Sequence, residues 1–421
     1  MDSYYSLPFT PGTRKLTLQT LNSHSAFRKP VRGYMRIYIK QLEFAYEMLT
    51  LAVKIEQEAE EKVYFKVTDS ELLVSCSVDT DESYLSRYAY FAIHKLMDPH
   101  HEFDFEEFYW PGFFDHKTGG SKFLAIKQIS GEAIFYLKTR YHGIYKPGQQ
   151  LPVLIDEPSA AHPVVPTIAE TVPKNDEPVL GFCLADTHPT SWHSNHWPFL
   201  VPYLGVLDRN KTFIKGFKSY VLNENDLFLA KLTDEQEQLV ELCIAMKKIA
   251  RMDLVVYVHE RHLREEKDQN NRRNFPKIYR LWQQAMPILA GRLYTHYYFT
   301  YGMRNVKRKP RKHDLKQCKF SSETPELCFI WKEFDDYYKL ELRFKLGKQI
   351  YTPSYLKNTV FFVNTDADPK TYYLLKSFTD CQVMSFFHQK EFKLLILKVH
   401  YNEYCEGFVD QLRGRYEFMK R

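Results

Sequence analysis

The sequence predicts a multidomain α+β protein, and three observations support this fold class. The chain has 421 residues, which is enough for two or three ordinary domains with separate cores. Hydrophobic residues make up 44% and aromatic residues 16%, so we expect a packed globular protein and not a disordered chain. Short alternating apolar stretches, typical of strands, occur beside a smaller number of apolar stretches with helical spacing.

A proline-rich segment indicates where the chain divides. Six prolines lie within residues 151–178, and proline both fixes φ and removes a hydrogen-bond donor, so this segment is expected to be an extended linker. The full expected order is a flexible arm (1–30), a mostly β unit (31–150), the linker (151–178), a mixed α/β unit of helices and strands (179–303), a basic stripe (304–319) and a C-terminal α/β unit (320–421).

The elements of the N-terminal unit follow from periodicity. Apolar residues alternate with polar or small ones from Phe44 to Ile55, which predicts a half-buried strand. Residues 62–97 read as a ββα element, with strands at 62–68 and 72–76, a turn at Asp69-Ser70 and a helix over 84–97 that docks on the sheet.

The remaining elements are expected in the two later units. A capping box from Thr233 to Gln236 predicts a helix that ends near Met252. A further helix over 277–293 is expected to be kinked or split at Pro287. Strands are predicted at 179–184, 199–203, 327–331, 338–344, 360–363 and 392–399, and helices at 369–379 and 402–412.

The cysteines and the N-terminus indicate the compartment. The seven cysteines are scattered, odd in number and never arranged as Cys-x-x-Cys, which favours reduced thiols in a cytoplasm. The first six residues lack a basic start and an apolar core, and no apolar run approaches about 18 residues. We therefore expect a cytoplasmic protein that does not enter a membrane.

The basic stripe is the strongest functional signal in the sequence. Residues 304–316 hold seven basic residues and one acid, so their net charge of +6 equals that of the whole chain. Such cations bind phosphates by releasing condensed counterions. The predicted nucleic-acid-binding residues are Arg304, Lys307, Arg308, Lys309, Arg311, Lys312 and Lys316, with Arg272 and Arg273. Lys277, Arg280 and Arg292 could extend this surface, and Tyr294, Tyr297, Tyr298, Phe299 and Tyr301 could offer stacking faces.

Two readings compete with nucleic-acid binding at the stripe. It could be a solvated loop that keeps the protein in solution, or it could face an acidic protein partner. The sequence alone does not separate DNA from RNA.

Other motifs are weaker indications of function. His188, His193 and His196 could bind a metal or belong to a polar loop, and the sequence leaves both open. Asp380 with Glu391-Phe392-Lys393 has the outline of a metal-dependent nuclease. The chain contains no phosphate-binding glycine loop and no serine-hydrolase elbow, so no catalytic residue and no cofactor is expected.

The ββα element at 62–97 resembles a SWIM-type zinc finger. Of the four zinc ligands of such a finger only Cys76 is present, because Cys76-Ser77-Val78 and Ser86-Arg87-Tyr88 replace the two ligand pairs. With the aromatic segments 103–105 and 108–112, the chain is similar to the region that precedes the motor in bacterial Swi/Snf-type DNA helicases carrying a SWIM finger. The resemblance implies a finger without metal and a DNA-associated accessory module that works with a separate motor.

Together these observations predict a non-catalytic nucleic-acid-binding accessory module. Its expected partners are DNA or RNA and a helicase or ATPase. The alternatives are a protein-interaction scaffold, whose aromatic sheets would recognise another subunit, and the metal-dependent nuclease.

Overall fold

The protein is described from a computed structural model of the whole chain. The structure describes residues 3–28, 35–78, 82–98, 100–129, 132–149, 151–152, 154, 178–185, 197–222, 232–250, 261–298, 312–313, 315–353 and 360–420, without the side chains of residues 128, 133, 261–272 and 298. It is a multidomain α+β protein, as the sequence predicts. Two compact units are present: unit 1 comprises 1–150, 335–338 and 395–404, and unit 2 comprises 151–334, 339–394 and 405–421.

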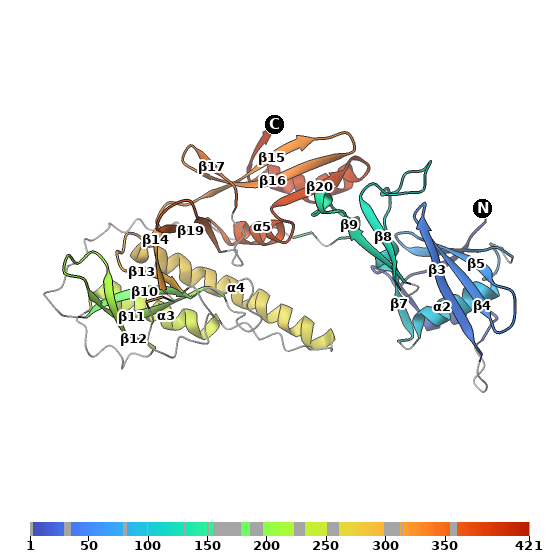
Figure 1. Cartoon of the computed structure of the whole chain (residues 1–421), viewed down its shortest axis with the longest axis horizontal. Coiled ribbons are helices and arrows are strands. Elements are labelled where there is room, and N and C mark those ends of the chain that lie inside the picture. Colours follow the sequence, from blue (N-terminus) through green and yellow to red (C-terminus); the bar gives the residue numbers. More distant parts are fainter. Residues whose placement is uncertain are drawn as a thin grey trace. The chain divides into compact units, whose positions relative to one another are not determined.

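Unit 1 is built on a five-stranded antiparallel sheet (Figure 1). Its strands, in spatial order, are β1 (Tyr5–Pro8), β6 (Glu71–Cys76), β5 (Glu61–Val67), β4 (Met48–Ile55) and β3 (Ile37–Ala45). Two small antiparallel pairs accompany it, β2 (Lys15–Thr17) with β7 (Glu102–Asp104) and β8 (Leu124–Ile129) with β9 (Glu132–Leu137). The helices are α1 (Leu18–Ser23), α2 (Arg87–Met97) and α6 (Tyr401–Tyr404), with short 3-10 turns at Phe105–Phe108, Thr139–Tyr141 and Lys398–His400.

The segment expected to be a flexible arm is folded onto this sheet. β1 pairs with β6, and Leu7, Leu16 and Leu21 are fully buried in the core of unit 1. Pro11 and Gly12 lie in the turn between β1 and β2, and Pro8 is the last residue of β1. The expectation of an arm over 1–30 was therefore wrong for the described residues 3–28, because few but well-placed apolar residues suffice to anchor a segment of this length.

The single strand expected over 44–55 is in fact the second half of a hairpin. β3 and β4 pair antiparallel and meet at a tight turn in which Tyr46 and Glu47 have φ of 54° and 61°. Two successive left-handed residues are the backbone of a type I′ turn, which suits the twist of a hairpin. The sequence pattern missed this turn because neither residue is glycine or asparagine.

The ββα element has the expected order of strands and helix. β5 and β6 form a hairpin, and α2 begins after Ser86, three residues later than expected. Tyr90, Phe91 and Ile93 are buried, so α2 contributes an apolar face to the core of unit 1. Cys76 is buried at the end of β6, and the described residues contain no cluster of His, Cys, Asp and Glu that could hold a metal.

Unit 2 contains a mixed seven-stranded sheet. Its spatial order is β12 (Ile214–Tyr220), β11 (Phe199–Leu207), β10 (Val179–Ala185), β13 (Thr295–Tyr298), β14 (Leu315–Ser321), β19 (Lys370–Leu374) and β18 (Phe361–Asn364). Two long helices belong to it, α3 (Asp234–Ile249) and α4 (Arg261–Leu289). The capping box at Thr233 and Gln236 is confirmed, since each side chain binds the backbone N–H of the other residue.

The rest of unit 2 is a smaller sheet with helices. Its strands, in spatial order, are β17 (Gln349–Tyr351), β16 (Tyr337–Leu346), β15 (Glu326–Glu333) and β21 (Glu417–Lys420), and β20 (Lys393–Leu397) pairs with β16. The strands predicted at 327–331 and 338–344 are confirmed as β15 and β16, which are neighbours in this sheet. The helices are α5 (Phe378–His388), a π-helical segment (Cys405–Val409) and α7 (Asp410–Arg413); the last two continue from α6 and replace the single helix expected over 402–412.

Two predicted helices differ from the structure. Residues 370–374 form β19, paired in parallel with β14 and antiparallel with β18, and the helix begins only after Ser377, whose side chain accepts from the N–H of Asp380. The helix expected from Lys277 begins at Arg261 and runs through both Pro276 and Pro287. Pairing with β14 and β18 makes residues 370–374 a strand. Burial of an apolar face stabilises α4 although it contains two prolines.

The expected division at 304–319 does not separate two domains. β14 includes the last residues of that segment and pairs on one side with β13 and on the other with β19. Strands from before and after the stripe are thus joined in one sheet. The linker residues 155–177 lie outside the described residues. Within the described part of the chain, no helix has the length and apolar character needed to cross a membrane.

Candidate nucleic-acid interface

Helix α4 is fixed to the seven-stranded sheet by large aromatic side chains. Trp282 is fully buried, its Nε1 donates to Pro198 O at 2.8 Å, and its ring meets the edge of Phe361 at 4.7 Å between centroids. Tyr279 is also buried and its hydroxyl donates to Leu375 O at 2.8 Å. These contacts set the rotation of α4 about its own axis and determine which residues face outward.

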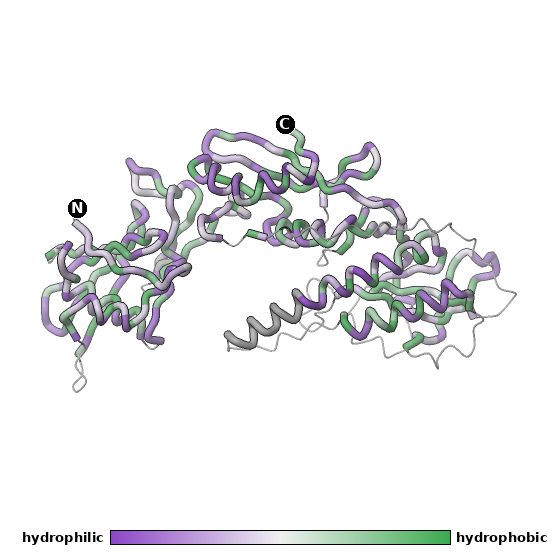
Figure 2. Tube along the Cα trace, turned by 180° about the vertical axis from the view of Figure 1, so that it is seen from behind, coloured by the Kyte–Doolittle hydropathy of each residue, from purple (hydrophilic) through white to green (hydrophobic). Residues whose placement is uncertain are grey.

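The outward side of α4 carries a line of basic residues. Arg273, Lys277 and Arg280 are all exposed, and their 4-3 spacing places them on one side of a helix. With a rise of about 1.5 Å per residue, successive members lie about 6 Å and 4.5 Å apart along the axis. We call these three residues the α4 basic face. Figure 2 shows hydrophilic and hydrophobic residues alternating along the described part of this helix.

Two members of the α4 basic face carry charges that no described carboxylate neutralises. Among the described residues, neither Arg273 nor Lys277 forms a salt bridge or hydrogen bond with a carboxylate. The described salt bridges of unit 2 include a group around Glu341, which accepts from Lys339 and from Arg343. The two cations are therefore available for an external anion.

A second group of cations lies on the sheet beside α4. Side chains alternate along a strand, so Lys316 shares a face of β14 with Phe320, whose ring lies 6.1 Å from that of Trp282. Lys316 is exposed and pairs across the sheet with Tyr297. Lys370, which the sequence analysis did not select, lies 5.4 Å from the Tyr297 ring centroid. Lys316, Lys370 and Tyr297 thus gather on the α4 side of the sheet.

Only some of the predicted nucleic-acid-binding residues are described in the structure. Arg304, Lys307, Arg308, Lys309 and Arg311 lie outside the described residues. Lys312 lies in an exposed turn, and Lys316 is an exposed residue near the start of β14. Arg272 lies within α4, where only its backbone is described, and Arg273 is exposed next to it.

Several residues expected to extend the nucleic-acid-binding surface are buried or half-buried. Arg292 is half-buried and its Nε donates to Ile288 O at 3.1 Å, so it satisfies a carbonyl at the end of α4 instead of facing solvent. Tyr294 is buried and its hydroxyl donates to Lys211 O at 3.1 Å, so it is not a stacking platform. Tyr297 is half-buried, and burial raises the pKa of its hydroxyl. The structure does not describe the side chain of Tyr298, and Phe299 and Tyr301 lie outside the described residues.

The nuclease outline is not assembled in the structure. Asp380 lies in the first turn of α5 and is buried, where it accepts from the Tyr416 hydroxyl at 2.8 Å; burial raises the pKa of its carboxyl. Glu391 follows the other end of this helix and forms an ion pair with Lys393 at 3.1 Å. About three helical turns separate the two carboxylates, so they do not share a metal position. His188, His193 and His196 lie outside the described residues.

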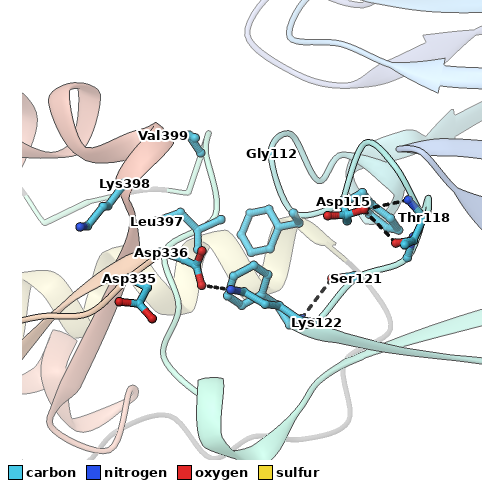
Figure 3. A pocket seen from close by; sticks show the side chains of 14 residues that line it. Gly112, Asp115, Thr118, Ser121, Lys122, Asp335, Asp336, Leu397, Lys398 and Val399 are labelled. Atoms are coloured by element: carbon cyan, nitrogen blue, oxygen red, sulfur yellow. Dashed lines mark hydrogen bonds and ion pairs between the residues drawn. The ribbon is translucent and has the colours of Figure 1, made fainter.

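A cavity in unit 1 also gathers charged side chains. It has a volume of about 620 Å³ and includes Asp115, Lys122, Asp335 and Asp336 in its lining. Figure 3 shows Lys122 reaching Asp336 on one side, with Asp115 turned toward Thr118 on the other. Backbone N–H groups of Thr118 and Lys117 donate to Asp115 Oδ1 at 2.7 and 3.0 Å and lower the pKa of its carboxyl. Asp115 and Asp336 are thus engaged with different partners, and the described residues hold no metal-binding group here.

Unit 2 has a smaller charged cavity of about 310 Å³ next to α5. Its lining contains three cations, Lys345, Lys376 and Arg415, and three acids, Glu326, Asp380 and Glu417. Lys345 pairs with Glu417 at 2.6 Å. The charges in this cavity balance, so it offers no net attraction to an anion or a cation.

Comparisons of this chain with protein-family models, with curated proteins and with solved structures find no match.

Proposed function

We propose that the chain is a nucleic-acid-binding accessory module that contacts DNA through the α4 basic face. The observation that carries this proposal is the line of Arg273, Lys277 and Arg280 on a helix whose opposite side is locked into the core. Cations held on a rigid element lose little conformational freedom when phosphates bind. Release of condensed counterions then supplies affinity that does not depend on base sequence.

The basic stripe belongs to the same proposal. Lys312 and Lys316, two described cations in the C-terminal part of the stripe, are exposed where the stripe enters β14. β14 packs against α4 through Phe320 and Trp282, so the stripe enters the sheet next to the helix that carries the α4 basic face. The stripe and the α4 basic face would together follow the phosphates of one nucleic acid.

Neutralising the α4 basic face tests the proposal. In the full-length chain, Arg273→Gln, Lys277→Gln and Arg280→Gln together should weaken binding to a fluorescent 20-base-pair duplex at least tenfold, measured by anisotropy. Because each lost phosphate contact reduces the slope of log K against log salt by about 0.9, the slope should become shallower by about 2 to 3. A stripe variant, with Lys307, Arg308, Lys309, Arg311 and Lys312 changed to Gln, should also weaken binding.

The matched control removes the same charge elsewhere on unit 2. Lys215, Lys218 and Lys348 are all exposed, and their joint replacement by Gln should change affinity less than twofold. Unchanged affinity and salt slope in the α4 variant would remove the α4 basic face from the proposal. An equal loss in the control variant would show that only net charge matters.

We further propose, from the resemblance to the region preceding Swi/Snf-type motors, that the module assists a separate helicase motor. A tagged full-length chain should then recover a Swi/Snf-type ATPase from its native cells, and adding the chain should increase that ATPase's DNA-stimulated turnover. The α4 variant should lose the stimulation. A complex that survives nuclease treatment and an ATPase whose turnover does not change would instead favour a protein-interaction scaffold.

A further inference from the structure

The five-stranded sheet of unit 1 has two unlike faces. One face carries the apolar core, in which Leu51, Val63 and Phe65 are fully buried together with residues of α2. Cross-strand register defines the other face, because directly paired residues lie on the same side of a sheet. Tyr38 pairs with Lys54, and Ala52 pairs with both Lys40 and Lys62.

This second face interleaves lysines with tyrosines. Along β5, Lys62, Tyr64 and Lys66 alternate with the buried Val63 and Phe65, which places the three on the outer side, Lys62 exposed and the other two half-buried. Along β3, Tyr38 and Lys40 occupy the same side and are both exposed, Tyr38 by 57%. We call Tyr38, Lys40, Lys54, Lys62, Tyr64 and Lys66 the open sheet face.

The long side chains cover small residues of β4, since Thr50 and Ala52 are both buried. Thr50 lies between the strands that carry Lys40 and Tyr64 and is directly paired with Tyr64, and Ala52 separates Lys40 from Lys62. Neighbouring strands are about 4.8 Å apart, so Lys40 and Lys62 begin about 10 Å from each other, and Tyr64 follows Lys62 by about 6.7 Å along the strand. The result is a platform of separated cations with aromatic rings between them.

The charge of the open sheet face is positive and not internally paired. The acids on this side are Glu43, opposite Thr50, and Glu71, which accepts from Ser6 Oγ at 2.5 Å. None of Lys40, Lys54, Lys62 and Lys66 forms a salt bridge with another described residue. Four lysines therefore face two acids, and the excess charge suits a polyanion.

Interleaved aromatic rings select among polyanions. A tyrosine ring can stack on any base whose face is free, whereas the bases of a duplex already stack on one another. Lysines on either side can follow the sugar-phosphate backbone. An acidic protein surface would match the charge but would leave the exposed Tyr38 ring without a planar partner.

We infer that the open sheet face is a binding site for single-stranded DNA, with Tyr38 and Tyr64 stacking on bases and the four lysines contacting phosphates. This inference rests on the proposed nucleic-acid function but uses residues of unit 1, none of which belongs to the α4 basic face. It gives the module a preference for separated strands, the form of DNA that a helicase-like motor produces.

The experiment compares strand forms with the full-length chain. Tyr38→Leu with Tyr64→Leu should weaken binding to fluorescent dT20 at least fivefold for each tyrosine, since stacking is worth about 1–3 kcal/mol per base. Binding to the 20-base-pair duplex should change less than twofold. Lys40→Gln with Lys62→Gln should also weaken dT20 binding, while Lys95→Gln with Lys117→Gln, which removes the same charge off the sheet, should not.

Conservative variants protect the test against misfolding. Tyr38→Phe with Tyr64→Phe retains the rings and should keep dT20 affinity within twofold. Ultraviolet crosslinking of iododeoxyuridine-substituted dT20 to the wild-type chain should yield peptides that contain Tyr38 or Tyr64. Leu variants that bind dT20 as tightly as wild type, or crosslinks confined to unit 2, would overturn the inference.

The outcomes separate this inference from the proposed function. A wild-type chain that binds the duplex but not dT20 would overturn the single-strand site and leave the α4 proposal standing. A chain that binds neither would overturn both. Tighter binding of rU20 than of dT20 would overturn the assignment to DNA.

Discussion

A buried histidine in unit 2 is held in its neutral form by its surroundings. His296 lies on β13 with its Nδ1 2.7 Å from the Tyr203 hydroxyl, and that hydroxyl donates to Tyr294 O at 3.2 Å. The Tyr203 ring lies against its cross-strand partner Gly181, where an added Cβ would approach the ring to within 2.3 Å. Glycine is therefore required at position 181 to admit the tyrosine that contacts His296.

Burial lowers the pKa of His296 from its ordinary value of 6.5 to about 4, which predicts acid sensitivity. Between these two values the unfolded chain holds a proton that the folded chain does not, so stability is full above pH 6.5 and falls as the pH approaches 4. From pH 7 to pH 5 this single group should reduce the unfolding free energy of unit 2 by about 2 kcal/mol. Urea unfolding at the two pH values measures the change.

His296→Gln isolates this contribution, because glutamine can still hydrogen-bond to Tyr203 but does not titrate. The variant should lose about 2 kcal/mol of the difference between pH 7 and pH 5, whatever its stability at pH 7. A pH dependence equal to that of the wild type would show that other groups carry the acid sensitivity.

At the scale of elements, local signals were predictable and long-range pairing was not. The α3 helix begins where its capping box requires, because Thr233 and Gln236 interact only with backbone three residues away. β19 was predicted to be a helix, although Thr371, Tyr372 and Tyr373 suit a strand, since its partner β14 is distant in sequence and was not itself predicted as a strand.

The candidate sites too were predictable only as far as local sequence patterns define them. The 4-3 spacing of Arg273, Lys277 and Arg280 is visible in the sequence, but the predicted helix began too late to contain Arg273. Recognising that Phe275 and Trp282 share the opposite side would have located the basic face. Lys62-x-Tyr64-x-Lys66 is also a local alternation, yet its pairing with Lys40 across Ala52 depends on sheet register.

At the scale of the whole molecule, the chain has two separate cores. Leu51 is fully buried in the core of unit 1, and Trp282 is fully buried in unit 2. Both units recruit distant segments, because residues 335–338 and 395–404 belong to unit 1 although unit 2 surrounds them in sequence. Each unit thus depends on chain regions that a division by sequence position would have separated.

Two cores predict two unfolding transitions in differential scanning calorimetry of the full-length chain. Leu51→Ala should destabilise unit 1 by about 2–5 kcal/mol and Trp282→Ala should destabilise unit 2 by about 3–5 kcal/mol, because each leaves a cavity. Each substitution should lower one transition temperature by several degrees and leave the other within about 1 °C of wild type. A single transition that both substitutions lower equally would mean that the units unfold as one cooperative body.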